Sequence, residues 1–240
     1  MLENTKRPNW IMGAISNEEI ECIENIIEFN KPSNCLEIGV ASGWSSGQIL
    51  KSLQKFTPES TLVGIDFLDY CYWDRTIPVG KYVHSLDYYY KEKYSLFTEH
   101  HILSVKEHLE NHFEPFDFLF IDANHKHPFP CVDLLFCLSI LKETKAIVVL
   151  HDINLPFINP QFPSHGVNHL FYELKDCMKF ESVSNEFKKS NLGVLFFDFD
   201  IYSKQEVAAQ LENIIKKFPI EAELSQEYID RINRRDYGIK

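Results

Sequence analysis

Apolar residues recur along this chain in short continuous runs that alternate with stretches of helical spacing. The 116–122 run, FDFLFID, is nearly all apolar, which is typical of a strand buried on both faces. The runs predict strands at 35–40, 61–66, 100–103, 116–122, 146–150, 180–184 and 191–199. The intervening spacing predicts helices over 15–29, 45–54, 105–111, 130–142 and 167–178, and then over 203–217 and 223–235. This alternation predicts a mostly parallel, seven-stranded α/β sheet with helices on both faces, in which the last two strands form an antiparallel pair.

The two ends of the chain carry further helix signals. Ser16 and Glu19 have the spacing of a capping box, and Ile15 with Ile20 has that of a hydrophobic staple. We expect residues 1–200 to form one domain and 201–240 to form a helical C-terminal extension. The extension carries apolar residues at helical spacing, which we expect to pack on the domain or on a second subunit of a homodimer: Val207, Leu211, Ile214 and Ile215.

A glycine turn follows the first predicted strand. Gly39 and Gly43 can adopt backbone angles closed to other residues, and a helix begins directly after them. Free N–H groups at a helix N-terminus favour a bound ligand with negative groups. The E-x-G-x-x-x-G spacing differs from the G-x-G-x-x-G of dinucleotide sites, however, and Glu37 suits a ligand with positive charge. The alternative is an ordinary tight turn.

Acidic residues repeat at the ends of successive predicted strands. Ligands of doubly wound sheets bind outside the carboxyl ends of the strands. Four of the first five strands end in or beside an acid at this edge: Glu37, Asp66, Asp122 and the pair His151-Asp152. Packing alone does not predict such repetition, so we interpret this edge as the functional site.

Composition narrows the class of protein. The chain has 240 residues, 45% of them hydrophobic, and a formal net charge of −11, which argues against a nucleic-acid backbone as the main partner. Its six cysteines lack metal-site spacing, which indicates buried thiols in a reducing compartment. Because no apolar run has membrane-spanning length and no leader is evident, we expect a cytoplasmic protein without a membrane partner.

Four motifs over residues 14–200 together resemble those of class I S-adenosylmethionine-dependent methyltransferases: LEIGVASGWSSG, VGID, FDFLFIDANH and VVLHD. The chain is similar to small-molecule O-methyltransferases of the catechol and caffeoyl-CoA type and to their relatives in antibiotic biosynthesis. The resemblance implies a Rossmann-like fold and S-adenosyl-L-methionine as cofactor. It also implies methyl transfer to a small hydroxylated acceptor.

The resemblance also assigns cofactor-binding residues. The glycine turn would hold the methionine part of the cofactor, and the acid after the second strand would bind the ribose. Ser104 is the nearest match to the serine that contacts adenine, although the usual glycine-acid pair before it is missing. The residues implied are Glu37, Gly39, Gly43, Ser45, Asp66, Ser104 and Asp122.

A divalent metal is a further implication of the family. Its ligands would be Asp122, His151 and Asp152, but catechol-type enzymes have Asp-Asn where this chain has His-Asp. A histidine among carboxylates suits Mn²⁺, Fe²⁺ or Zn²⁺ better than Mg²⁺. His125 stands where a lysine base occurs in the catechol type, and we expect it to take the acceptor proton; the alternative is a solvated loop residue.

Two long segments that follow predicted strands indicate where the methyl acceptor would bind. We expect the aromatic stretch 67–94 and the proline-rich loop 156–166 to form the acceptor side of the pocket, although packing is the simpler account of the aromatic rings. Three other functions stay open: a metal-dependent hydrolase, an NAD-dependent oxidoreductase and a non-catalytic S-adenosylmethionine-binding protein. The first leaves the glycine turn and Asp66 unexplained, and the second prefers the other glycine spacing.

Overall fold

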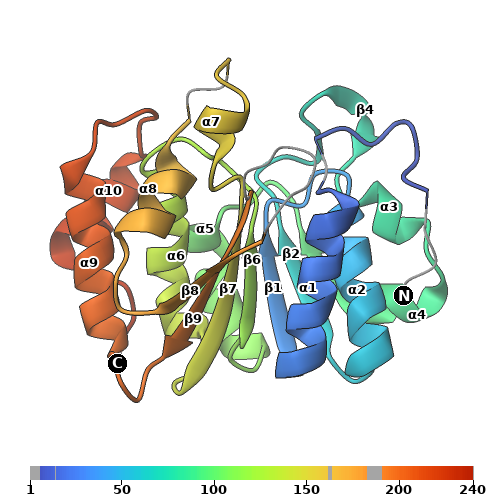
Figure 1. The fold of residues 1–240 in the computed structure, drawn as a ribbon, viewed down its shortest axis with the longest axis horizontal. Helices are drawn as coiled ribbons and strands as arrows, with labels where there is room; N and C mark the ends of the chain where they lie inside the picture. The colour runs from blue at the N-terminus through green and yellow to red at the C-terminus, as the bar shows by residue number, and fades with distance from the viewer. Residues whose placement is uncertain (1–5, 14, 162–163, 183–190, 240) are drawn as a thin grey trace.

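A computed structural model describes residues 6–13, 15–161, 164–182 and 191–239. The strands of its central sheet are β1 (Asn34–Ile38), β2 (Thr61–Ile65), β5 (Tyr94–Phe97), β6 (Phe118–Ile121), β7 (Lys145–His151), β8 (Met178–Glu181) and β9 (Leu192–Asp198). They lie in the order β5-β2-β1-β6-β7-β9-β8 (Figure 1). The first five strands are parallel, while β9 runs antiparallel to both β7 and β8. The predicted fold class is therefore confirmed.

Helices cover both faces of this sheet (Figure 1). They are α1 (Asn17–Asn30), α2 (Trp44–Phe56), α3 (Lys81–His84), α4 (Tyr88–Glu92), α5 (Ile102–His112), α6 (Phe129–Cys137), α7 (Leu155–Ile158), α8 (Gly166–Glu173), α9 (Lys204–Lys217) and α10 (Gln226–Arg234). Because side chains alternate along a strand, each strand supplies two cores. In β6, Phe118 and Phe120 pack on the α1–α2 side, whereas Leu119 and Ile121 pack on the α5–α6 side.

The predicted capping box starts α1. The backbone N–H of Ser16 donates to Glu19 Oε2 over 2.7 Å, and the N–H of Glu19 donates back to Ser16 Oγ over 3.3 Å. Lys31 ends the helix in a left-handed conformation, with φ at 50°, before Pro32. The chain then enters β1 at the centre of the sheet.

The predicted third strand is wrong in position. The strand is Tyr94–Phe97, and residues 100–103 instead lead into α5. The hydrophobic pattern did not predict β5 because this edge strand has half-buried side chains, which give only a weak apolar pattern. Ile102, Leu103 and Val105 are buried at the start of the amphipathic helix.

Two other segments differ from expectation. The helix predicted over 167–178 ends at Glu173, because Leu174 is extended and Met178 begins β8. The 67–94 stretch is partly regular, since it contains α3, α4 and a hairpin of β3 (Tyr70–Cys71) and β4 (Asp74–Pro78).

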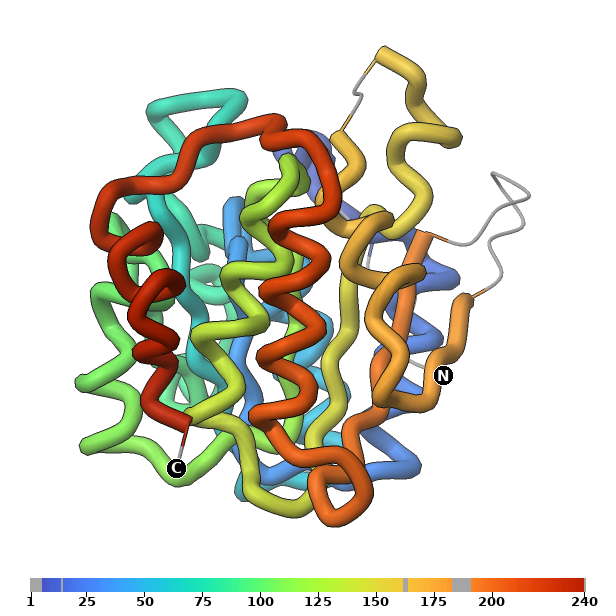
Figure 2. Tube along the Cα trace, turned by 90° about the vertical axis from the view of Figure 1, so that its left-hand side faces the viewer, coloured from blue at the N-terminus to red at the C-terminus, as the bar shows by residue number. Residues whose placement is uncertain are grey.

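The C-terminal helices pack on the body of the domain. Figure 2 shows α9 running along one side of α6 and α10 lying on the other side of α6. Val207 and Leu211 are fully buried in the same core as α5 and α6, and Ile214 and Ile215 are nearly so. That face is therefore not available for a second subunit. The division of the chain at residue 200 stays a prediction.

Truncating Leu211 to Ala should lower the free energy of unfolding by about 2–5 kcal/mol, because a fully buried leucine leaves a cavity. The matched control is Ile220→Ala, since Ile220 is 56% exposed and its loss should change stability by less than about 0.5 kcal/mol. Urea denaturation measures both. Equal small losses would contradict a core role for α9.

Candidate functional site

The glycine turn after β1 passes very close to the end of β6. A Cβ atom at Gly39 would lie 2.1 Å from the carbonyl oxygen of Asp122, and Gly39 has φ at 90°. Gly43, with φ at 78°, precedes the first turn of α2. Only glycine fits this approach at position 39. The turn after β1 therefore packs directly against the backbone at the end of β6.

Asp66 holds the turn from the other side. Its Oδ2 accepts hydrogen bonds from the backbone N–H groups of Val40 and Ala41, over 2.9 Å and 2.8 Å. Its Oδ1 accepts from the N–H of Leu68 over 2.9 Å. The acid that ends β2 thus lies against the glycine turn, where the sequence predicted a shared pocket.

Glu37 is a fully buried carboxyl group at the base of the turn. It accepts hydrogen bonds from the hydroxyls of Ser45, over 2.5 Å, and Ser46. Burial, together with the negative charges of Asp122 and Asp66, raises the pKa of Glu37 to about 8, although the hydrogen bonds from Ser45 and Ser46 act to lower it. A positively charged ligand group nearby would favour the ionised form of this carboxyl.

Four side chains converge at the ends of β6 and β7: Asp122, His125, His151 and Asp152. One ligand atom from each lies within 4.8 Å of all the others. His125 Nε2 is 2.9 Å from Asp152 Oδ2 and 3.3 Å from Asp122 Oδ1. His151 Nδ1 is 3.1 Å from Asp122 Oδ1 and 3.6 Å from Asp152 Oδ2. The structure thus brings the predicted base and the three predicted metal ligands into one cluster.

The charges of this cluster balance one another. Burial alone would raise the pKa values of Asp122 and Asp152, but His151 and His125 hold both pKa values below their ordinary range. Burial alone would lower the pKa of each histidine, but the two carboxylates raise the pKa of His125 to about 9 and that of His151 well above its usual value. Without a ligand, two imidazolium groups therefore neutralise two carboxylates.

The donor set fits a divalent cation. Nε2 of His125 is buried and has no hydrogen-bond partner among the described residues, although two carboxylates lie within ion-pair distance. A cation held by Asp122, His151 and Asp152 would replace the histidine protons as the positive charge and would leave Nε2 of His125 beside it with a free lone pair. One imidazole with two carboxylates suits Mn²⁺, Fe²⁺ or Zn²⁺.

Sequence reasoning missed several residues around the cluster. Asn191 donates from Nδ2 to Asp152 Oδ1 over 2.6 Å, and it lies there because β9 enters the sheet antiparallel beside the end of β7. Glu19 Oε1 lies 3.4 Å from His151 Nε2. Tyr72, in the turn of the β3–β4 hairpin, has an exposed ring, but partial desolvation of its hydroxyl and then the charges of Asp122 and Asp152 raise its pKa. For Glu19 the sequence signal was the capping box, which indicated a helix start, and for Tyr72 it was the aromatic stretch 67–94 as a whole; Asn191 had no signal.

Glu221 ties the C-terminal extension to the two loops beside the cluster. Its carboxylate accepts from the backbone N–H groups of His127, over 2.8 Å, and His165, over 3.0 Å. Its own N–H donates to the carbonyl of His127 over 2.9 Å. The loop that carries His125 is thus held from outside residues 1–200.

Ser104 does not directly follow a strand, and its adenine contact stays a prediction. It lies in the first turn of α5, where its hydroxyl donates to the carbonyl of His101 over 2.8 Å and accepts from the N–H of His101 over 3.2 Å. These bonds cap the helix. The chain beside Asp66 is instead the segment after Phe97, since the N–H of His100 donates to the carbonyl of Asp66.

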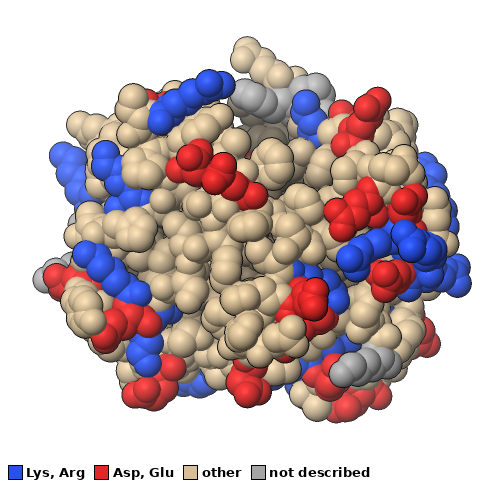
Figure 3. Space-filling view, turned by 180° about the vertical axis from the view of Figure 1, so that it is seen from behind, with Lys and Arg blue, Asp and Glu red and all other residues tan. Residues whose placement is uncertain are grey.

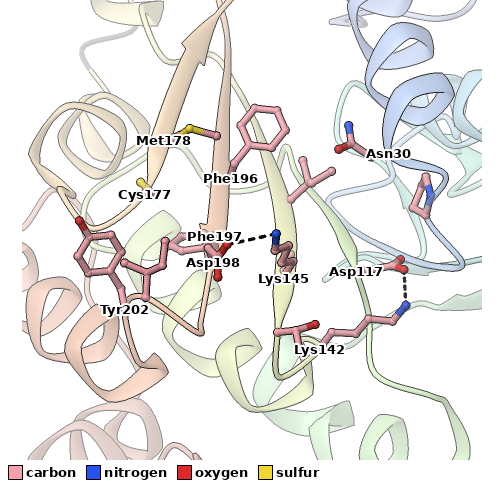
Figure 4. Close-up of a pocket in the computed structure, with 15 residues that line it drawn as sticks. Asn30, Asp117, Lys142, Lys145, Cys177, Met178, Phe196, Phe197, Asp198 and Tyr202 are labelled. Atoms are coloured by element: carbon pink, nitrogen blue, oxygen red, sulfur yellow. Dashed lines mark hydrogen bonds and ion pairs between the residues drawn. The ribbon is translucent and has the colours of Figure 1, made fainter.

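A cavity of about 520 Å³ lies at the opposite edge of the sheet (Figure 4). Asp117 and Lys145, which line it, lie at the amino ends of β6 and β7, away from the glycine turn. Its charges are paired, with Lys142 Nζ 2.6 Å from Asp117 and Lys145 Nζ 3.3 Å from Asp198. The cavity brings together none of the predicted site residues. Within the described ranges, no helix combines the length and apolar character needed to cross a membrane.

Comparisons with known proteins agree with the fold. Residues 36–153 match the model of a family described as a methyltransferase domain. An O-methyltransferase of Streptomyces achromogenes involved in tomaymycin synthesis, solved with S-adenosylmethionine, is 19% identical; the match covers 77% of this chain and 81% of that one, with a TM-score of 0.57. An O-methyltransferase of Bacillus cereus, solved with S-adenosylhomocysteine, is 14% identical over 79% of this chain and 84% of its own, also with a TM-score of 0.57. Among curated proteins, none matches this chain significantly.

The fold and the turn thus define a Rossmann-like methyltransferase domain. Within it, residues 36–153 match the methyltransferase-domain family, which agrees with the class I S-adenosylmethionine-dependent methyltransferase that the motifs predicted.

Replacing Glu37 by Gln should stabilise the ligand-free protein more at pH 8 than at pH 5. A carboxyl whose pKa is raised on folding favours folding fully only below its unfolded pKa, and that contribution is lost as pH rises through about 8. The difference in unfolding free energy between variant and wild type should therefore grow by about 2–4 kcal/mol from pH 5 to pH 8. Urea denaturation across that range measures it. Glu59→Gln, at an exposed glutamate, is the control; parallel curves for Glu37→Gln and wild type would contradict the raised pKa.

Proposed function

We propose that this protein transfers the methyl group of S-adenosyl-L-methionine to a hydroxyl oxygen of a small molecule. The observation that carries the proposal is the contact between Gly39 and Asp122, which joins the cofactor-type turn to the acid–histidine cluster. The methyl donor and the acceptor would then meet between them. The names of the similar proteins, both O-methyltransferases, support transfer to oxygen.

The cofactor would lie across the ends of β1 and β2. Glu37 and Ser45 lie at the base of the turn, where the positive methionine end would favour an ionised Glu37. Gly39 and Gly43 leave the backbone open to close approach. Asp66 would accept hydrogen bonds from the ribose hydroxyls. Its carboxylate oxygens have lone pairs that are not used by the backbone N–H groups of Val40, Ala41 and Leu68.

Asp122, His151 and Asp152 would hold a divalent cation, which would bind the acceptor hydroxyl and lower its pKa. The acceptor oxygen would form a bond to the methyl carbon while the carbon–sulfur bond breaks, leaving S-adenosylhomocysteine. We assign His125 as the base that receives the acceptor proton. Its Nε2 faces the same two carboxylates, and neutralising them would remove what raises its pKa and so free the nitrogen to accept.

Two segments support an acceptor side at this edge of the sheet. The β3–β4 hairpin and α7 both rise beyond the carboxyl ends of the strands (Figure 1). Each presents an exposed aromatic residue, Tyr72 at 69% and Phe157 at 56%. Other aromatic residues of 67–94 serve packing, since Tyr82 is buried against Trp44. The exposed aromatic rings of Tyr72 and Phe157 could pack against a flat, hydroxylated acceptor.

Charge and cysteine state support a cytoplasmic enzyme with small-molecule partners. All six cysteines are free thiols. On the face shown in Figure 3, Lys and Arg side chains are interspersed with Asp and Glu, which does not favour a nucleic-acid partner. A non-catalytic S-adenosylmethionine-binding protein is the alternative, and turnover on an acceptor separates the two.

Replacing Asp66 by Ala should weaken S-adenosylhomocysteine binding by about 1.5–3 kcal/mol, or roughly 10- to 150-fold in Kd, because carboxylate hydrogen bonds are lost. Isothermal titration calorimetry measures this. The control is Asp74→Ala, an exposed acid in the same connection that accepts hydrogen bonds from Thr76, and the Kd of this variant should stay unchanged. Unchanged affinity in a folded Asp66→Ala variant would overturn the cofactor assignment.

Replacing Asp152 by Ala should abolish turnover and Mn²⁺ binding while leaving S-adenosylhomocysteine binding nearly intact. Formation of S-adenosylhomocysteine with a panel of small phenols and sugars measures turnover, and chelated wild type should be inactive until Mn²⁺ is restored. The control is Asp198→Ala, at the opposite end of the sheet beside Lys145. Full activity after exhaustive chelation would leave a metal-free mechanism with His125 or His151 as base.

A further inference from the structure

Glu19 is a buried carboxylate that reaches the cluster from the N-terminal helix. It lies in the first turn of α1 and is only 5% exposed. Its Oε2 accepts from the backbone of Ser16, while its Oε1 lies 3.4 Å from Nε2 of His151. One carboxylate thus contacts both a helix start and a predicted metal ligand.

Capping alone does not explain the burial of Glu19. The same motif starts α9, where Ser203 and Glu206 form an equivalent capping box. Glu206 is exposed, and within the described part of the chain it forms hydrogen bonds with Ser203 and no contact with a histidine. A capping glutamate therefore needs no buried site. Burying a carboxylate is costly unless a partner compensates, and His151 is the partner that Glu19 has and Glu206 lacks.

The imidazole of His151 lies between two sets of acids. Nε2 faces Glu19, and Nδ1 faces Asp122 at 3.1 Å and Asp152 at 3.6 Å. A histidine that binds a metal commonly donates its other ring N–H to a carboxylate, which fixes the tautomer and the ring orientation. Here that arrangement would keep the proton on Nε2 and leave the Nδ1 lone pair directed at the cluster.

We propose that Glu19 is a positioning residue, which holds His151 with Nε2 toward α1 so that Nδ1 binds the divalent cation. This inference rests on the metal-assisted part of the proposed function. It gives the N-terminal helix a role in the site, because α1 would orient a ligand that β7 supplies.

Calorimetric titration of the full chain with Mn²⁺ alone tests the inference. Glu19→Gln keeps the shape of the side chain but removes its charge, and it should weaken Mn²⁺ binding by about 10- to 100-fold. Glu206→Gln removes the matching carboxylate from the other capping box and should bind Mn²⁺ like wild type. Ser16→Ala removes the hydroxyl that caps α1 but keeps Glu19, so it should also bind like wild type.

A second measurement reports the ring of His151 directly. In ¹⁵N-histidine spectra of the Zn²⁺-loaded wild type, His151 should be metallated at Nδ1 and protonated at Nε2. In Glu19→Gln the signals should show mixed tautomers. Thermal unfolding of each variant identifies loss of fold, and if Glu19→Gln does not fold, Glu19→Asp, whose shorter side chain withdraws from Nε2, takes its place with the same expectation.

Each outcome decides the point. Wild-type Mn²⁺ affinity in folded Glu19→Gln, or equal losses in Glu19→Gln and Ser16→Ala, would overturn the positioning role and leave the proposed function intact. No Mn²⁺ binding by wild type would overturn both the inference and the metal-assisted mechanism. S-adenosylhomocysteine binding, titrated in parallel, would still report on the methyltransferase assignment.

Discussion

The turn after β1 runs so close to the end of β6 that no side chain fits at position 39. This approach brings two chemically different regions together. On one side lie the backbone and hydroxyl groups that suit the methionine end of a cofactor, and on the other lie Asp122 and its histidine neighbours. A bulkier residue would have to push the strand ends apart, and the distance over which the methyl group must travel would grow with it.

Electrostatics shapes the rest of this edge. The carboxyl ends of parallel strands lie along the same side of the sheet. Acids at the ends of neighbouring strands therefore repel one another unless positive charges lie between them. In the ligand-free protein the intervening charges are protons on His125 and His151. The divalent cation that we propose would replace those protons as the positive charge between the carboxylates. Glu37 stands apart from this exchange, since its partners are hydroxyls and its pKa is raised to about 8.

Strands buried on both faces were predictable because their apolar runs are continuous, and the acids that end them follow from strand direction alone. Edge strand β5 was misplaced because its half-buried side chains give a weak apolar pattern in the sequence. Residues such as Asn191 and Glu221 could not be found from spacing. Asn191 reaches Asp152 through antiparallel pairing, and Glu221 reaches the loops at His127 and His165 through a returning segment, so both contacts depend on tertiary packing.

The contacts of Glu221 also bear on the order in which the site forms during synthesis. Asp122, His125 and Asp152 leave the ribosome well before Asn191, which holds Asp152, and before Glu221, which binds the loops at His127 and His165. A nascent chain that has already formed the parallel strands would still lack these tethers. The loops around the cluster are therefore fully tethered only after the chain through Glu221 has been synthesised and has folded back onto them.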